Sequence, residues 1–77
     1  MNILPNKHVE EKDTLLYAGA LILKELNDSP KSVSMLWNHM KNLDSIKTFD
    51  RFVATLDMLF ILGAIEFKNN KLNQVIL

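Results

Sequence analysis

Few side chains in this sequence are of the types that perform acid–base, nucleophilic or metal chemistry, and those few stand far apart. The chain has no cysteine and two histidines, His8 and His39, neither with a companion at ligand spacing. Asp50 and Asp57 fall on one face of a predicted helix, but a rise of about 10 Å separates them. General acid–base catalysis needs two titratable groups near one reacting atom. We therefore expect no catalytic site, no metal and no cofactor, and interpret the protein as a non-enzyme.

Features that bind phosphate are equally sparse. Two glycines are too few for a glycine-rich phosphate loop. Nine basic residues balance nine acidic ones, which leaves no overall field to hold a nucleic-acid backbone. Local contacts with nucleic acid would fall to Arg51, Lys68 and Lys71, with Lys31 and Lys41 elsewhere. Two or three phosphate contacts give only weak, salt-sensitive binding, so DNA is expected to be a weak partner.

The apolar content favours association with another protein. A chain of 77 residues is short, and such chains bury only about 60% of the surface that the unfolded form exposes. Nevertheless, 48% of the residues are apolar, and no disulfide adds stability. Some apolar surface is therefore expected to meet another chain, and a homodimer of the isolated protein is one such association.

The length allows a single domain, and its surroundings are predicted to be aqueous. Residues 1–12 are expected to form an extended arm around Pro5, and residues 13–77 the domain. The longest apolar run, Met58 to Ile65, falls far short of the roughly 20 residues that span a bilayer. No membrane contact is predicted, and the cytoplasm is the expected location.

Three helices are predicted from apolar residues that recur three and four positions apart. The expected N-caps are Asp13 or Thr14, then Ser32 or Ser34, then Thr48, and the expected ends are Asn27, Asn42 and Gly63. Residues 43–47 are interpreted as a polar connector. The third helix is expected to face inward with Phe49, Phe52, Val53, Leu56, Leu59 and Phe60. Its outer face is expected to hold Asp50, Arg51, Ala54, Thr55, Asp57 and Met58, an acidic set that would repel phosphate.

A β-hairpin is predicted after Gly63. Residues 65–67 alternate apolar and polar side chains, Asn69 and Asn70 tolerate the positive φ of a tight turn, and residues 72–76 return. The side chains expected to lie against the helices are Ile65, Phe67, Leu72 and Val75. The fold class is thus mainly α with a small β-hairpin, a winged helix-turn-helix-like arrangement of three helices and a C-terminal wing. The alternative is a plain three-helix bundle with a frayed tail.

Three residues on the first two helices are candidates for close contacts. Gly19, inside the first helix, costs about 1 kcal/mol relative to alanine, which indicates close approach of another helix. Tyr17 borders this small-residue patch, where an internal helix or a partner would pack. Trp37 on the second helix either fills the core, the favoured interpretation, or anchors a partner. His39, two positions later, is expected at the surface.

Several segments together resemble a known family. They are residues 3–8, 15–23 and 33–37, the block 49–60, and residues 62–66, which read ILPNKH, LLYAGALIL, VSMLW, FDRFVATLDMLF and LGAIE. In these segments the chain resembles the small middle components of ABC-three-component systems, prokaryotic conflict systems that pair an SMC-like ABC ATPase with an effector.

The resemblance implies a non-enzymatic adapter that bridges the ATPase to its effector in defence against phage or plasmids. It carries over one polar signature in the arm, formed by Leu4, Pro5, Lys7 and His8. These residues either contact a partner or hold the arm against the domain's own core. The competing hypothesis from the fold alone is a winged-helix DNA-binding transcriptional regulator, for which Lys68 and Lys71 would supply the wing contacts.

Overall fold

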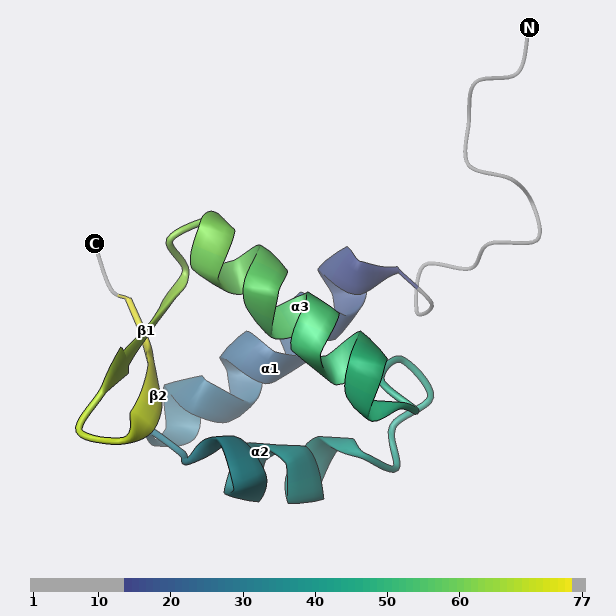
Figure 1. Cartoon of the computed structure of the whole chain (residues 1–77), viewed down its shortest axis with the longest axis horizontal. Helices are drawn as coiled ribbons and strands as arrows, with labels where there is room; N and C mark the ends of the chain where they lie inside the picture. The colour runs from purple at the N-terminus through teal and green to yellow at the C-terminus, as the bar shows by residue number, and fades with distance from the viewer. Residues whose placement is uncertain (1–13, 76–77) are drawn as a thin grey trace, which may run out of the picture.

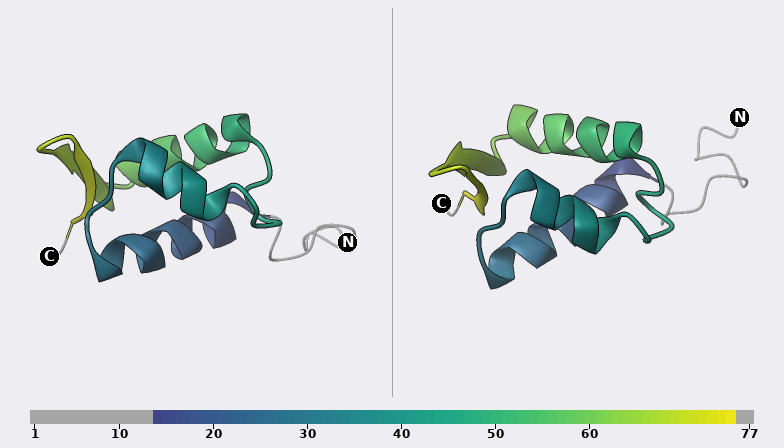
Figure 2. Two further views of the ribbon diagram at one scale, coloured as in Figure 1. Left: turned by 90° about the horizontal axis from the view of Figure 1, so that it is seen from below. Right: turned by 60° about the horizontal axis from the view of Figure 1, so that its bottom comes forward.

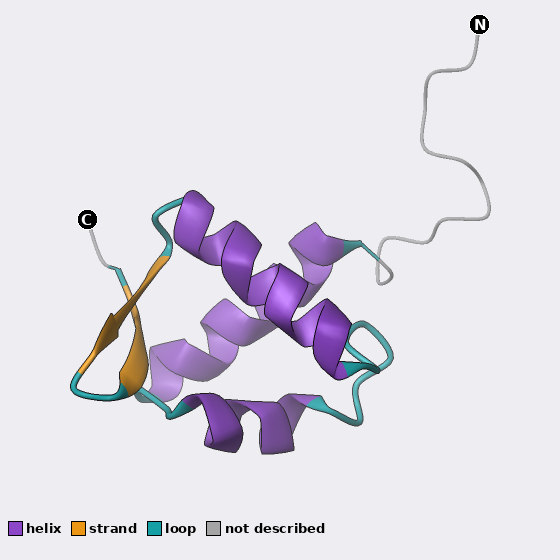
Figure 3. Cartoon of the chain, in the orientation of Figure 1, coloured by secondary structure: helices purple, strands orange, loops and turns teal. Residues whose placement is uncertain are grey.

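The computed structural model describes residues 14–75, and this part of the chain folds in the predicted order (Figures 1 and 3). The elements are α1 (Leu15–Asp28), α2 (Val33–Met40), α3 (Phe49–Ile61), β1 (Ile65–Lys68) and β2 (Lys71–Gln74). α3 crosses α1, α2 lies beside both, and the hairpin closes the end of the domain at which α3 finishes (Figures 1 and 2). The fold is mainly helical and winged-helix-like.

Each helix starts at a hydroxyl side chain that caps its first turn, as predicted. The side-chain oxygens of Thr14, Ser32 and Thr48 accept hydrogen bonds from the backbone N–H groups of Tyr17, Met35 and Arg51 respectively. Such a cap satisfies one of the backbone donors that a helix start leaves without a partner. α1 ends one residue later than expected, and α2 ends at Met40, two residues earlier than expected.

The core is a single cluster between the three helices and the hairpin. Its buried members are Ala18, Ile22, Leu26, Leu36, Met40, Ile46, Phe52, Leu56, Leu59, Ile65 and Leu72. α1 and α3 touch at Gly19, where an added Cβ would lie 2.8 Å from Met58 Cε and 3.1 Å from Leu59 Cδ2. The predicted close approach of a helix at Gly19 is confirmed, and that helix belongs to the same chain.

The connector between α2 and α3 takes part in the core, so its interpretation as a polar linker is wrong. Ile46 is completely buried and Ser45 is 3% exposed. The Arg51 Nε–H donates to the carbonyl oxygen of Ser45, which ties this loop to α3. An apolar side chain within a short polar segment carries no periodicity, and periodicity was the signal for the core.

The hairpin is a regular wing. Gly63 adopts φ +72°, which ends α3 in the left-handed conformation, and Asn69 and Asn70 have φ of 55° and 62°. Positive φ at both central residues is the type I′ turn that suits a two-residue hairpin. The register pairs Ile65 with Gln74 and Phe67 with Leu72. The alternative, a three-helix bundle with a frayed tail, is wrong because this tail is paired with itself and with the core.

The wing is also joined to the segment before α2. Lys31 N–H donates to the Leu72 carbonyl at 3.2 Å, and Leu72 N–H donates back to the Lys31 carbonyl at 2.7 Å. This two-way bridge fixes β2 against the start of α2. A two-stranded ribbon is marginal by itself in water, so the bridge and the burial of Leu72 explain why the wing is ordered here.

The predicted faces of α3 and of the wing need correction at five residues. Phe49, Val53 and Phe60 are 51%, 38% and 42% exposed, although they were expected to face inward. Thr55, expected on the outer face, is completely buried, and its hydroxyl donates to the Arg51 carbonyl at 2.7 Å. On the wing, Phe67 is 55% exposed instead of packed against the helices. The buried face of α3 is narrower than its apolar face because α1 and the wing cover only one side of the helix.

Candidate functional site

The densest polar cluster joins α1, the loop after it and α2. Glu25 Oε2 lies 3.1 Å from His39 Nδ1 and 3.6 Å from Lys31 Nζ. The Lys31 ammonium also donates to the Glu25 carbonyl, to the Ser29 carbonyl and to Ser29 Oγ, at 3.1 to 3.3 Å. The His39 hydrogen bond, and after it the charge of Lys31, lower the pKa of Glu25 below its ordinary value, while partial burial opposes them.

This cluster holds the fold together rather than presenting reactive groups. The Lys31 side chain is 7% exposed and its donors are taken up, so the expectation of a nucleic-acid contact at Lys31 is wrong. His39 is at the surface, as predicted, with a side chain 47% exposed. Across residues 14–75, no group of three or more His, Asp or Glu side chains is placed to hold a metal ion.

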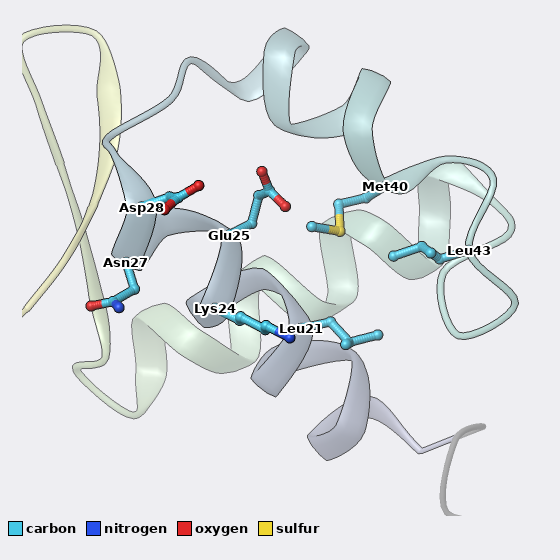
Figure 4. A pocket seen from close by; sticks show the side chains of 7 residues that line it. All are labelled: Leu21, Lys24, Glu25, Asn27, Asp28, Met40 and Leu43. Carbon is cyan, nitrogen blue, oxygen red and sulfur yellow. The ribbon is translucent and has the colours of Figure 1, made fainter.

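Two shallow hollows lie along α1. The larger, of about 410 Å³, is bordered by side chains of α1, the end of α2 and the loop after it, drawn in Figure 4. Its residues are Leu21, Lys24, Glu25, Asn27, Asp28, Met40 and Leu43. The second, of about 260 Å³, lies between the end of α1 and β2, where Gln74 Oε1 is buried without a hydrogen-bond partner. Neither hollow brings a nucleophile next to a base, which is what covalent catalysis needs.

The outer side of α3 carries the most distinctive surface of the described domain. We define the α3 stripe as Phe49, Val53, Leu56 and Phe60. Leu56 is 7% exposed and lies at the base of the stripe, while the other three are at least 38% exposed. Ile61 and Leu62 follow at the end of the helix, 85% and 64% exposed. Exposed apolar area that gathers on one element marks an interaction site in soluble domains.

An aromatic group extends the α3 stripe toward α2. The ring of Trp37 meets Phe49 edge-on with centroids 5.3 Å apart, and Phe52 lies 5.3 Å away on its buried side. Trp37 is half-buried and packs against the core cluster. It therefore fills the core edge, the favoured interpretation, and also supports Phe49, a ring that stands in solvent.

The remaining candidate residues lie apart from one another. Tyr17 is 38% exposed and Leu16 70% exposed on the first turn of α1. Lys68 and Lys71 are exposed and flank the turn of the wing. Arg51 is half-buried and engaged with the connector, so it does not extend that basic pair. The arm residues Leu4, Pro5, Lys7 and His8 lie outside the described residues.

Sequence reasoning missed the α3 stripe as a surface because its apolar residues were all assigned to the core. A signal was available, since the stripe repeats at intervals of four, three and four residues, with Asp50 and Asp57 one position after Phe49 and Leu56. Acidic residues beside apolar ones at that spacing are typical of a seam between two helices. The link between Glu25 and His39 was also missed, because the two residues lie on different helices.

Comparison with known protein families gives a match over nearly the whole chain. The family model described as ABC-three component (ABC-3C) system Middle Component 6 matches residues 4–76. That span includes the four arm residues as well as the whole described domain. No curated protein and no solved structure matches the chain. Within residues 14–75, no helix is long and apolar enough to cross a membrane.

Proposed function

Because the chain belongs to the ABC-three component system Middle Component 6 family, we propose that it is a non-enzymatic adapter of such a system. It bridges the SMC-like ABC ATPase and the effector protein of the same operon through protein–protein contacts. The family places a middle component in a system of several proteins. A component that catalyses no reaction contributes to such a system by binding the other proteins, which is the role of an adapter.

The observation that carries the proposal is the exposed apolar surface of α3. Phe49, Phe60 and Ile61 leave 42–85% of their surface in water, and each thereby forgoes part of the roughly 1.5–3 kcal/mol that full burial of such a side chain provides. The titratable residues of the described part of the chain, by contrast, are dispersed or tied into the Glu25 cluster. Contact with other proteins accounts for both facts.

The adapter would work in the cytoplasm in defence against phage or plasmids. The test at this level is biological: an operon that protects a host strain should lose protection when this gene alone is deleted, and regain it from a plasmid copy. Full protection without the gene would contradict the role.

The bridging step has a direct biochemical test. The ATPase and the effector are co-purified with and without this protein and analysed by size-exclusion chromatography. A bridge predicts that the two larger proteins elute together only when this chain is present. Elution of the ATPase and effector together in its absence would contradict bridging, and failure of this chain to bind either one would contradict the adapter role.

A DNA-binding regulator is the second candidate, favoured by the winged-helix-like fold and by the exposed wing lysines Lys68 and Lys71. Two phosphate contacts give a shallow salt dependence and weak affinity. Fluorescence anisotropy with a labelled duplex at low salt tests it, with Lys68→Ala/Lys71→Ala as the matched variant. Binding that the double variant removes would favour this candidate, and no binding at tens of micromolar protein would eliminate it.

A further inference from the structure

The α3 stripe has the spacing of a helix-docking seam. Its members lie four, three and four residues apart, which is the alternation that keeps apolar side chains on one line along a helix that packs against another. Among residues 14–75 no helix covers this line: Phe49, Val53 and Phe60 are exposed, and Leu56 belongs to the core. At the start of the line, Phe49 is in contact on one side with the rings of Trp37 and Phe52. The stripe therefore has the residue spacing of one side of a helix–helix contact.

Negative charge lies along one edge of the α3 stripe. Asp50 and Asp57 are exposed, stand seven residues apart, and each follows a stripe residue directly. The opposite edge is formed by Phe52 and Leu59, which are 0% and 2% exposed and belong to the core. A helix laid on the stripe therefore meets carboxylates along its open edge and apolar atoms along the other.

We propose that the α3 stripe docks an amphipathic helix of a partner protein that carries lysine or arginine beside its apolar face. Such a helix covers Phe49, Val53 and Phe60 and places its cations opposite Asp50 and Asp57. Charges that flank an apolar seam select the partner and its orientation. The proposal rests on the adapter function and names the chemistry of one partner surface.

The same charges disfavour the other occupants. A two-fold pair of copies uses the same patch on both subunits, so the acidic edge of one stripe would have no complementary edge on the other. A DNA backbone would bring phosphates against two carboxylates in the groove-facing position of α3. A basic amphipathic helix is the occupant that both the apolar stripe and its flank accept.

The first experiment measures binding of the operon's ATPase and effector, each in turn, to the full chain. The variant Asp50→Lys/Asp57→Lys reverses the sign of the charge beside the α3 stripe. The matched control Asp44→Lys/Glu66→Lys makes the same change in net charge at exposed sites outside α3. We expect the α3 variant to lose at least about tenfold in affinity for one partner, and the control to stay within about a factor of two. Equal affinities for the two variants would overturn the proposal while the adapter function stands.

Asp50 is in the first turn of α3, where a negative charge stabilises the helix, so the free variants are also compared for stability. The neutral variant Asp50→Asn/Asp57→Asn keeps helix-compatible residues and should show a smaller loss of affinity in the same direction. The proposal would also be overturned if the asparagine variant kept its affinity and the lysine variant lost affinity only because it no longer folded.

A second experiment is independent of the operon's proteins. Two designed helical peptides of about three heptads share one leucine–isoleucine stripe and differ only in the flanking residues, lysine in one and glutamate in the other. The full chain should bind the lysine peptide at least about tenfold more tightly, and Asp50→Lys/Asp57→Lys should reverse this preference while the control does not. Equal binding of the two peptides, or a preference that the lysine variant does not reverse, would contradict the proposal that the α3 stripe docks a basic helix. If the peptides discriminate but neither operon protein binds the wild type, the adapter function fails and the surface chemistry stands.

Discussion

At the scale of single residues, Gly19 shows how one missing side chain sets the distance between two helices. The space at its Cα is taken up by Met58 and Leu59 of α3. Met58 ends in a flexible methyl group that can move aside, whereas Leu59 is 2% exposed and is held by the core. A small side chain is therefore tolerated here better than a branched one.

Substitution of Gly19 by valine should destabilise the protein by about 1–3 kcal/mol, because three added carbon atoms must enter an occupied space. The measurement is urea unfolding followed by Trp37 fluorescence. Ala20→Val is the matched control, since Ala20 is exposed on the same helix and its change should cost less than about 0.7 kcal/mol of helix propensity. Equal losses for the two variants would show that α1 and α3 are not in contact at Gly19.

The Glu25 carboxylate makes stability depend on pH. Its pKa is lowered in the folded state by the His39 hydrogen bond and by Lys31, so its ionised form is the one that stabilises the fold. That contribution is present above the pKa of the unfolded chain and is lost as pH falls through the lower folded value.

We therefore expect wild type to be more stable than Glu25→Gln at pH 7, and the difference to shrink as pH falls below about 4.3, the pKa of an ordinary glutamate. The urea midpoints of both proteins between pH 7 and pH 3 measure this. A difference that stays constant over the whole range would contradict the role of the charged form. Lys24, which neighbours Glu25 in sequence and is exposed, supplies the control variant Lys24→Gln.

At the scale of elements, the wing shows that two side chains on one face need not be equally buried. Phe67 and Leu72 are cross-strand partners. Leu72 is 1% exposed, because the bridge to Lys31 holds β2 against the helices, while Phe67 on β1 has no such bridge beside it and is 55% exposed. Distance from the helices, rather than the alternation of the strand, decides burial here.

Leu72→Ala should cost about 2–5 kcal/mol, as expected for truncation of a buried leucine. Phe67→Ala should cost less than about 1 kcal/mol, the range of a single cross-strand pair. Both values come from urea unfolding at neutral pH. If Phe67→Ala proved as destabilising as Leu72→Ala, the wing would have to pack more closely on the helices than it does here.

At the scale of the whole molecule, a small core and an exposed apolar face belong together. A domain of this size buries a modest share of its surface, so its stability is small and sensitive to whatever binds the folded state. A partner that covers the α3 stripe binds only the folded chain, because the stripe exists only when α3 is formed.

A saturating partner should therefore raise the stability of the protein. At a free partner concentration of one hundred times Kd the gain is about 2.7 kcal/mol. Hydrogen exchange of the α3 amides, measured with and without the partner, reports this gain residue by residue. Asp50→Lys/Asp57→Lys should show little of the gain at the same partner concentration. An equal gain in that variant would place the partner on another face.

Local chemistry in the sequence determined where the elements begin, end and turn. Thr14, Ser32 and Thr48 cap helices because a hydroxyl reaches the backbone N–H three residues ahead. Gly63 and the pair Asn69 and Asn70 take positive φ because their side chains tolerate it. These effects act within a few residues, so the order of elements, the wing and the resemblance to the family were all within reach of the sequence.

Only the tertiary structure decided which apolar side chains are core and which are surface. Burial depends on how far a neighbouring element extends, and no local pattern records that extent. Phe52 and Phe60 are both apolar residues of α3, yet one is fully buried and the other is 42% exposed, because the neighbouring elements cover one side of the helix. The burial of Lys31 and Ile46 has the same origin. Because of it, Lys31 is not available for a nucleic-acid contact, and Ile46, a loop residue, belongs to the core. The α3 stripe, with Asp50 and Asp57 along its open edge, emerged as a surface for the same physical reason.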